Sequence, residues 1–312
     1  MAQSILKKTI PGLPEAERAN ERVALADKIS LRGVNVKFTS KAGARSVLEG
    51  VDLNIKAGEF VCLVGPSGCG KSTLLNVIAG LYKADTGTVL KDGVPITGPG
   101  PDRAVIFQEA ALFPWLTAVQ NVEFALKASI KNKQERRAKA MEYLGTVHLA
   151  RFAASHPHEL SGGMRQRVAI ARALALNPDI LLMDEPFAAL DAQTRDILLL
   201  EVQRIWHETG KTILFVTHNV LEAVALGDRV LCMGTRPGCI NQEISVTLPR
   251  PRVMEEPETA RLAKRIMTHL RDEIAKIVQE ESDYAARELA LAGDGDTDRL
   301  RNPAANTMGD GI

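Results

Sequence analysis

The sequence predicts an α/β fold built on a mainly parallel sheet, and three observations carry that prediction. Short apolar runs typical of buried strands, such as residues 60–64 and 180–183, alternate with segments of helical periodicity. A glycine-rich segment, residues 65–73, lies between one of these strands and a helix. The other strand ends in two carboxylates, Asp184 and Glu185. Strands that alternate with helices are typical of a parallel sheet covered by helices on both faces.

The composition agrees with a soluble globular protein. The chain has 312 residues, 45% of them hydrophobic and 25% charged, enough for one large α/β domain with an appendage or for two modest domains. A formal net charge of +1 gives no general attraction to nucleic acid. No apolar run approaches ~18 residues, the length of a membrane span, and the N-terminus lacks the apolar core of a secretory signal. The four cysteines show no metal-ligand spacing, so we expect a reducing cytosol.

The predicted strands follow from apolar runs and from turn residues. Residues 29–38 have their apolar side chains spaced as in a strand with a slip or bulge. Residues 91–93 indicate a tight turn after another strand. The other strands are expected at residues 47–55, 60–64, 88–90, 103–107, 180–183, 212–216 and 229–233.

Helices are predicted where the apolar residues recur at longer spacing. Residues 162–176 form a helix that stops before Pro178, because the residue before a proline is disfavoured in the α conformation. A long amphipathic helix over residues 191–208 is ended by Gly210. The other helical segments are expected at residues 72–79, 118–147, 220–226 and, beyond a break at 249–252, about 258–280.

The composition of the two ends of the chain predicts less order there than in the rest. Residues 1–28 are polar and are expected to form a mobile arm with one short helical stretch near residues 15–27. Residues 286–312 are expected to be disordered, since the chain becomes rich in Asp, Gly, Asn and Pro after about Gly293.

Residues 65–73 (Gly-Pro-Ser-Gly-Cys-Gly-Lys-Ser-Thr) fit the pattern G-x-x-x-x-G-K-[ST] of a phosphate-binding loop. Glycines let several backbone N–H groups point at one centre, and the helix dipole adds positive charge. Lys71 supplies a full charge for the β- and γ-phosphates, and Ser72 offers a hydroxyl to Mg²⁺. The alternative is a glycine-rich turn before a core helix. The predicted nucleotide-phosphate contacts, which the resemblance described below assigns to ATP, are Gly65, Pro66, Ser67, Gly68, Cys69, Gly70, Lys71, Ser72 and Thr73.

Cys69 carries a prediction of its own. It lies in this loop near Lys71 and a helix N-terminus, an environment that lowers the pKa of a thiol. We therefore expect bulky thiol reagents to block ATP binding.

Asp184 and Glu185 end an apolar strand, where buried carboxylates are costly unless they bind something. Beside a phosphate loop, Asp184 is suited to hold Mg²⁺, directly or through water. Glu185 is suited to polarise the water that attacks the γ-phosphate. The alternative is a surface Asp-Glu pair at the end of a strand.

Residues 160–167 (Leu-Ser-Gly-Gly-Met-Arg-Gln-Arg) form a second candidate anion site, because Ser161 and two glycines precede a helix N-terminus. Alone, such a segment would be an ordinary helix cap. Together with the loop at 65–73 and the strand at 180–185, it resembles the signature of the ATP-binding-cassette (ABC) ATPases. The resemblance covers about residues 29–246.

The resemblance implies a P-loop NTPase fold with a mainly parallel core sheet, an antiparallel β subdomain and a helical subdomain. The ATPase domain is then expected at residues 29–248, with its helical subdomain at about 109–177. A C-terminal helical extension is expected at residues 249–285.

Further residues acquire roles from the resemblance. Phe38 matches the aromatic ring that stacks on adenine, and its alternative is a strand core residue. Gln108 matches the glutamine that reaches Mg²⁺ and the attacking water, and His218 matches the histidine that contacts the γ-phosphate. The implied catalytic set is Glu185, His218, Gln108 and Lys71, and the implied Mg²⁺ set is Ser72, Gln108 and Asp184.

The resemblance also implies a head-to-tail dimer that holds two ATP molecules. Each ATP is expected between one chain's loop at 65–73 and the other chain's Ser161, Gly162 and Gly163, with Asp191 in the loop that crosses to the opposite subunit. Two departures from the family pattern are Met164, where glutamine is frequent, and Asn219, where aspartate is frequent. Both bear on the rate of hydrolysis more than on its existence.

The chain has one cassette and no membrane span, so we expect separate integral membrane permease subunits and a peripheral position on the cytoplasmic side of the cell membrane. A solute-binding protein would be an indirect partner. Phe113 and Trp115 in the loop after Gln108 favour contact with a cytoplasmic helix of the permease. Packing of Phe113 within the helical subdomain is the alternative.

Several stretches resemble the importer ATPases for nitrate, sulfonates and taurine. They are residues 98–103, 113–115, 185–195, 206–210 and 236–238. The leading hypothesis is the energy-coupling ATPase of an importer. The alternatives are the ATPase of an exporter, a soluble cassette ATPase of DNA repair or translation, and a phosphate-loop GTPase, for which no Asn-Lys-x-Asp motif is present.

Overall fold

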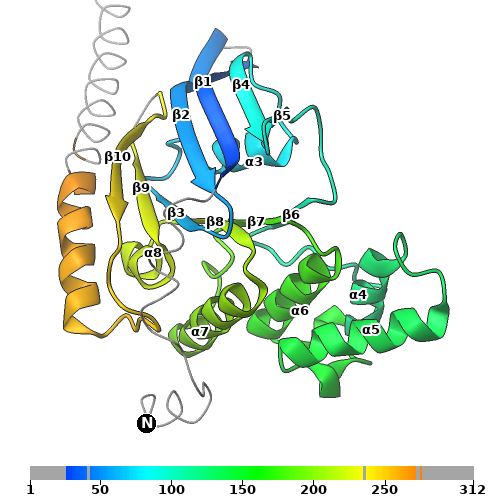
Figure 1. Ribbon diagram of the computed structural model, residues 1–312. Helices are drawn as coiled ribbons and strands as arrows, with labels where there is room; N and C mark the ends of the chain where they lie inside the picture. Colours follow the sequence, from blue (N-terminus) through cyan, green and yellow to red (C-terminus); the bar gives the residue numbers. More distant parts are fainter. Residues whose placement is uncertain (1–25, 41–42, 235–236, 272–274, 276–312) are drawn as a thin grey trace, which may run out of the picture.

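The computed structural model describes residues 26–40, 43–234, 237–271 and 275, whose strands form two sheets with helices packed between and beside them (Figure 1). The larger sheet has the order β10-β9-β3-β8-β7-β6. Its strands are β3 (Phe60–Val64), β6 (Arg103–Ile106), β7 (Ile180–Asp184), β8 (Thr212–Thr217), β9 (Arg229–Met233) and β10 (Ile240–Ser245). All neighbours pair in parallel except β10, which pairs antiparallel with β9. The prediction of a mainly parallel core sheet is therefore confirmed.

The smaller sheet is antiparallel, with the order β2-β1-β4-β5. Its strands are β1 (Asp27–Ser40), β2 (Gly43–Lys56), β4 (Thr86–Lys91) and β5 (Val94–Pro95). The register of β1 on β2 shifts between Leu31 and Val34 and again up to Lys37. These shifts are the irregularity that the spacing of apolar residues in this strand predicts.

The following α-helices begin at polar side-chain caps, except the first, which follows Gly70. They are α3 (Lys71–Ala79), α4 (Ala118–Leu126), α5 (Lys133–Thr146), α6 (Gly162–Ala175), α7 (Ala192–Thr209) and α8 (Val220–Leu226), with 3₁₀ turns η2 (Ala150–Phe152) and η3 (Pro157–Glu159). The helical region expected over residues 118–147 holds two helices. The break between them comes from Asn132, whose side chain accepts hydrogen bonds from the backbone N–H groups of Gln134 and Glu135 and so begins α5.

Strand β3 separates two hydrophobic cores. Phe60, Cys62 and Val64 face the core that includes residues of α4 to α8. Val61 and Leu63 face the core that includes α3 and the antiparallel sheet. A strand buried on both faces has no polar alternation, so β3 appears in the sequence as a continuous apolar run. Because β3 is packed on both faces, the loop that joins it to α3 is held at the carboxyl end of this strand.

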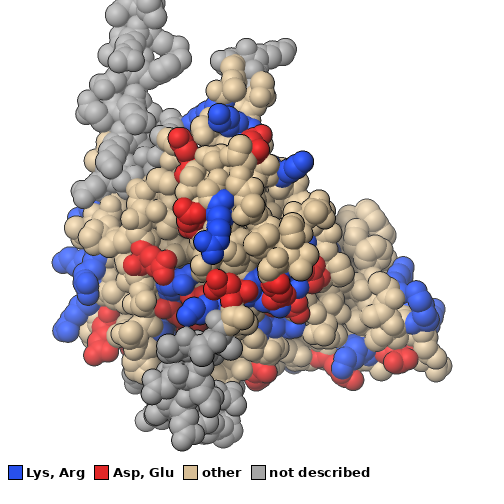
Figure 2. Space-filling model, turned by 45° about the horizontal axis from the view of Figure 1, so that its top comes forward, with Lys and Arg blue, Asp and Glu red and all other residues tan. Residues whose placement is uncertain are grey.

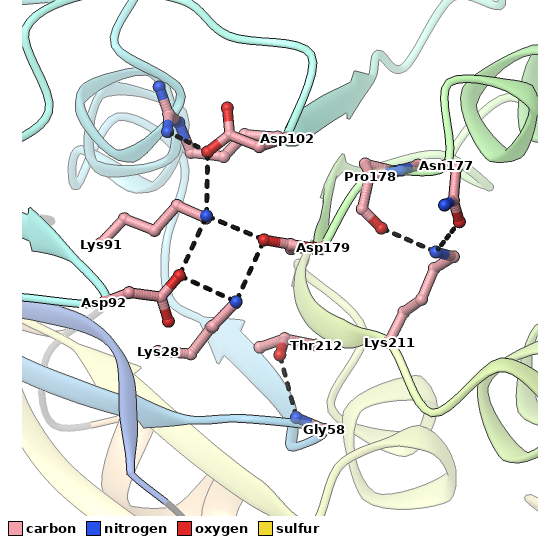
Figure 3. A network of polar contacts seen from close by, with 11 residues as sticks. Lys28, Gly58, Lys91, Asp92, Asp102, Asn177, Pro178, Asp179, Lys211 and Thr212 are labelled. Carbon is pink, nitrogen blue, oxygen red and sulfur yellow. Dashed lines mark hydrogen bonds and ion pairs between the residues drawn. The ribbon is translucent and has the colours of Figure 1, made fainter.

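An ion-pair network joins the two sheets near the end of β4 and the starts of β6 and β7 (Figure 3). Lys91 Nζ lies 2.8 Å from Asp179 Oδ2, 3.0 Å from Asp92 Oδ2 and 3.2 Å from Asp102 Oδ2. Lys28 Nζ pairs with Asp92 at 2.9 Å and with Asp179 at 3.1 Å. The hydrogen bonds from Lys91 and then Lys28 lower the pKa of Asp179. Lysines of the antiparallel sheet thus contact aspartates at the base of the parallel sheet.

Residues 257–271 form a further helix, drawn in orange in Figure 1, beside the outer part of the parallel sheet. Ala263, Ile266 and Leu270 from this helix are buried in the same core as α7 and α8. The segment before the helix is anchored by Arg252, which is 3% exposed. Its guanidinium donates to the carbonyl oxygens of Val224, Gly227, Val246 and Leu248.

Three expected segments lie wholly or partly outside the described residues. Two strands in the described part of the chain were not predicted. The tail expected at 286–312 lies outside the described residues. So does the helix expected near residues 15–27, apart from Ala26, which precedes β1, and Asp27, which begins it. The end of the helix expected near residue 280 lies outside them as well. The sequence did not predict β5 or β10.

The surface carries charges of both signs. On the face shown in Figure 2, basic and acidic side chains alternate, and neither sign forms a large continuous area. Among the described residues, none of the helices combines the length and the apolar character needed to cross a bilayer.

Candidate nucleotide-binding site

The glycine-rich loop between β3 and α3 curls around its own lysine. Lys71 is 6% exposed, and its Nζ donates to the carbonyl oxygens of Gly65 and Pro66, each at 2.9 Å. Gly70 caps α3 with φ 101°, in the left-handed region that favours glycine. A β-carbon at Gly70 would lie 2.8 Å from Leu48 Cδ2, so the loop also rests closely on β2. The sequence pattern thus folds into the strand–loop–helix context that a phosphate loop requires.

Two carboxylates at the end of β7 lie beside this loop. Ser72 Oγ donates to Asp184 Oδ1 at 3.0 Å, and Lys71 Nζ lies 3.9 Å from Glu185 Oε1. Burial raises the pKa of Asp184, while the hydrogen bond from Ser72 opposes the shift. Glu185 has φ 44°, an uncommon conformation for a residue other than glycine. Glu185 directly follows β7, so this uncommon backbone conformation lies at the point where the strand ends.

His218 lies against the second carboxylate. It follows β8, the strand next to β7, and its Nδ1 is 2.8 Å from Glu185 Oε2. The side chain of His218 is 60% exposed and that of Glu185 is 23% exposed. The pair therefore faces outward from the edge of the sheet, where a bound molecule could reach it.

A cavity of about 380 Å³ brings nine of the predicted residues together, while Gly65, Pro66 and His218 do not line it. It lies between the loop, the end of β7 and Gln108, which follows β6. Its lining residues are Val47, Ser67, Gly68, Gly70, Lys71, Ser72, Thr73, Gln108, Asp184 and Glu185. Val47 was missed by the sequence analysis, because an apolar residue near a strand end carries no signal for a ligand.

The oxygen atoms in this cavity fit Mg²⁺. The Ser72 hydroxyl and the Asp184 carboxylate are already in contact, and the amide of Gln108 lines the same cavity. Magnesium prefers such hard oxygen ligands and usually takes only one or two carboxylates, with phosphate and water completing the shell.

The prediction of a lowered pKa for the Cys69 thiol is wrong. Its side chain is 2% exposed, and burial raises the pKa of the thiol, with Lys71 only partly opposing the shift. Cys69 Sγ points toward Gly65, at which a β-carbon would lie 2.9 Å from it. The sequence places the thiol near positive charge, but the fold turns it into the core beneath the loop, where the neutral form is favoured.

Phe38 lies on β1 and is 43% exposed, and it is not among the lining residues of the cavity. It packs edge-to-face on Tyr82, with 5.6 Å between the ring centroids. An aromatic ring that is exposed on one side and supported on the other is available for stacking.

The residues expected to act on a second copy lie at the N-termini of α6 and α7. Ser161 Oγ accepts the N–H of Met164 at 3.3 Å at the start of α6. Asp191 Oδ1 accepts the N–H of Thr194 at 3.0 Å at the start of α7, and these hydrogen bonds lower the pKa of Asp191. None of Ser161, Gly162, Gly163 and Asp191 lines the cavity formed by the described residues.

Comparisons with known proteins agree with this geometry. Residues 48–188 match the protein family described as ABC transporter. The nitrate import ATP-binding protein NrtD of Synechocystis sp. is 44% identical over 252 residues, 78% of this chain and 95% of that protein. The taurine import ATP-binding protein TauB of Burkholderia pseudomallei is 44% identical over 230 residues, 74% of this chain and 88% of that protein.

A solved structure gives the same picture of the fold. It is a dimeric ATP-binding cassette in a post-hydrolysis state, bound to ADP and Pi, with a TM-score of 0.64 and 37% identity over 70% of this chain and 99% of that one. The phosphate loop, the carboxylate strand and the extent of these similarities lead to one conclusion. The chain belongs to the ABC transporter ATP-binding proteins, a family of ATP-binding ATPases.

Proposed function

We propose that this chain is the ATP-hydrolysing, energy-coupling subunit of an importer for a small anion such as nitrate, a sulfonate or taurine. The observation that carries the proposal is the cavity that gathers Lys71, Ser72, Asp184 and Glu185 under one phosphate loop, with His218 on Glu185. The relatives named for nitrate and taurine import support the choice of import and of solute class.

The residues of the site have separate roles in this proposal. The backbone N–H groups of residues 65–73 and the Lys71 ammonium hold the β- and γ-phosphates. Glu185 accepts a proton from the attacking water, while His218 holds the Glu185 carboxylate in place and reaches toward the γ-phosphate. Bound Mg²⁺, held by Ser72, Asp184 and Gln108, would neutralise charge on the phosphate oxygens. Phe38 stacks on adenine.

The proposal includes a head-to-tail dimer in which residues 161–163 and Asp191 contact the ATP of the second copy. Their absence from the lining of the chain's own cavity agrees with a contribution to a partner's site. The dimeric cassette that this chain resembles supports a dimer.

A membrane permease is the further partner in this proposal. Trp115 is 70% exposed, and Phe113 holds its loop by packing on Phe124 at 4.7 Å between ring centroids. Arg172 of α6 fixes the same loop by donating to the carbonyl oxygen of Ala111 at 2.8 Å. A rigidly held loop that displays one exposed aromatic ring suits contact with a cytoplasmic helix of the permease. The subunit would then be peripheral, on the cytoplasmic side, and coupled indirectly to a solute-binding protein.

The division of the chain is part of the proposal. We keep an ATPase unit at residues 29–248, with a helical part at about 109–177 that contains α4, α5 and α6, and an extension at 249–285. The packing of Ile266 into the core of α7 and α8 supports an extension that is docked rather than free.

Two experiments test the function. The purified chain should hydrolyse ATP in the presence of Mg²⁺, Lys71→Ala should abolish binding, and Glu185→Gln should bind ATP and accumulate as a dimer on gel filtration. Wild-type turnover in Glu185→Gln would remove Glu185 as the base.

In cells, deletion of the gene should abolish uptake of one labelled solute among nitrate, taurine, an alkanesulfonate and bicarbonate. The wild-type gene should restore this uptake, and the Lys71→Ala gene should not. Unchanged uptake of all four solutes, with ATPase activity intact, would argue for another solute or for export.

A further inference from the structure

Two residues outside the proposed site connect the loop that carries Asp191 to the loop that carries His218. We infer that Arg195 and Glu222 are positioning residues that hold His218 against Glu185 when a second copy docks on residues 190–191. The inference rests on the function proposed above and deepens it, because it names the route from the subunit contact to the reacting groups.

Glu222 is a buried carboxylate on which two hydrogen-bond donors and one arginine converge. It belongs to α8 and is 5% exposed. Thr217 Oγ1 donates to Glu222 Oε2 at 2.6 Å, and Asn219 Nδ2 donates to Oε1 at 3.3 Å. Arg195 Nε lies 3.5 Å from Oε1. Burial raises the pKa of Glu222, and these partners oppose the shift. A carboxylate is costly at such depth unless it is paired in this way.

Arg195 reaches both loops with one planar group. It lies in the first turns of α7, four residues after Asp191, and its backbone N–H donates to the Asp191 carbonyl at 3.0 Å. Its Nη2 donates to the carbonyl oxygen of Leu190 at 3.0 Å, while its Nε faces Glu222. Because the guanidinium is rigid, a displacement of residues 190–191 moves both of its contacts together.

The contacts of Glu222 close around His218. Thr217 and Asn219 flank this histidine, and Asn219 N also donates to Thr217 Oγ1 at 3.0 Å. Asn219 further caps α8 by accepting the N–H of Leu221. The backbone of His218 is thus held from both sides by groups tied to Glu222. Its ring, in turn, lies 2.8 Å from Glu185 Oε2.

Helix α7 offers a matched pair of residues on which to test the inference. Glu201 is 8% exposed, and its Oε1 lies 2.6 Å from Arg204 Nη2. Arg204 also pairs with Glu208 and donates to the carbonyl oxygen of Thr146. This second pair has the same residue types, and its arginine lies on the same helix as Arg195. Within the described part of the chain, its contacts include none of the proposed site residues.

The experiment uses the full chain with Arg195→Gln, Glu222→Gln and the double variant, and with Arg204→Gln and Glu201→Gln as controls. Steady-state kcat and KM for ATP, the dissociation constant of a fluorescent ATP analogue with its binding stoichiometry, and Tm are measured for each. Glutamine at position 222 presents an amide NH₂ to a cluster of donors, so the site loses an acceptor while its volume is kept.

We expect kcat per bound nucleotide to fall about tenfold in each single variant, with nucleotide affinity within about twofold of wild type. The double variant should lose about tenfold rather than about a hundredfold, because residues of one network are not additive. Arg204→Gln and Glu201→Gln should keep the wild-type kcat. Arg195 has a side chain 27% exposed, so Arg195→Gln keeps the test available even where Glu222→Gln fails to fold.

Three results would overturn the inference. One is an equal loss of kcat in the control pair at the same fall in Tm, which would make the effect one of stability alone. Another is full additivity of the two changes. The third is a wild-type rate in Arg195→Gln while Lys71→Ala is inactive. An active Lys71→Ala would instead overturn the proposed function itself, and the inference with it.

Discussion

Substitution of Gly163 by alanine tests how closely α6 lies on α7. A β-carbon at Gly163 would lie 2.2 Å from Thr194 Cγ2, so Thr194 or the helix must shift. Threonine is stiff about χ1 in a helix, which limits the shift. Overpacking of this kind costs about 1–3 kcal/mol, and alanine recovers up to about 1 kcal/mol over glycine within a helix. We expect a net loss of about 1–2 kcal/mol, which lowers Tm by roughly 2–8 °C at about 2–4 °C per kcal/mol.

Two variants make the test specific. Thr194→Ser removes the methyl group in question and should restore Tm in the Gly163→Ala background. Gly162→Ala should change Tm far less, because its β-carbon would meet only the ends of flexible side chains, Leu190 Cδ2 at 3.3 Å and Arg165 Nη2 at 3.9 Å. Tm is measured by differential scanning fluorimetry, and ATP turnover is measured in parallel.

Tm and ATP turnover should respond differently in the Gly163→Ala, Thr194→Ser double variant. In the proposed dimer, Gly163 faces the ATP of the second copy, so Thr194→Ser should restore stability without restoring turnover. The reasoning about packing is refuted by a Gly163→Ala protein that melts at or above the wild-type Tm. It is also refuted by a double variant whose Tm stays low.

Other predictions concern the charge network, the thiols and the exposed loop. Asp179→Asn should lower the free energy of unfolding by ~1 kcal/mol or less, since Asp179 is partly exposed, and by less at 0.5 M than at 20 mM NaCl in urea titrations. Lysine contacts lower the folded-state pKa of Asp179 below 3.8, so this contribution is present above that pH and lost as the pH falls through the lowered pKa. Iodoacetamide should label buried Cys69 more slowly than Cys239 in the folded protein and at an equal rate in urea, by peptide mass spectrometry. Trp115→Ala should leave Tm and the ATPase rate of the isolated subunit unchanged and abolish solute uptake.

Local signals made the site largely predictable. The strand before Gly65 and the strand before Asp184 are apolar on both faces, and both lie in the parallel sheet that the sequence predicts. Because the carboxyl ends of parallel strands share one edge, the loop and the carboxylates had to meet there. The contact between His218 and Glu185 follows from the same topology, since β8 lies beside β7.

What could not be predicted depends on contacts between distant segments. Strand β10 is a half-exposed edge strand that alternates polar residues with Ile240 and Ile244, so its short pattern resembles a loop. The direction of the Cys69 side chain depends on how the phosphate loop rests on Leu48 and Met233, which are far away in the sequence. The approach of Val47 to the cavity comes from the same packing. Periodicity and motif spacing carry none of this information.

The hydrogen bonds of Arg252 have a practical consequence for anyone who shortens this protein. Its guanidinium donates to carbonyl oxygens from three places. They belong to Val224 in α8, to Gly227 between α8 and β9, and to Val246 and Leu248 after β10. A chain cut at residue 248 would leave Val224, Gly227 and Val246 without that donor, although no residue of the catalytic cavity would be lost. Tags, fusion partners and interface probes are therefore better joined beyond residue 271. Arg252 then keeps its carbonyl acceptors, and Ile266 remains buried.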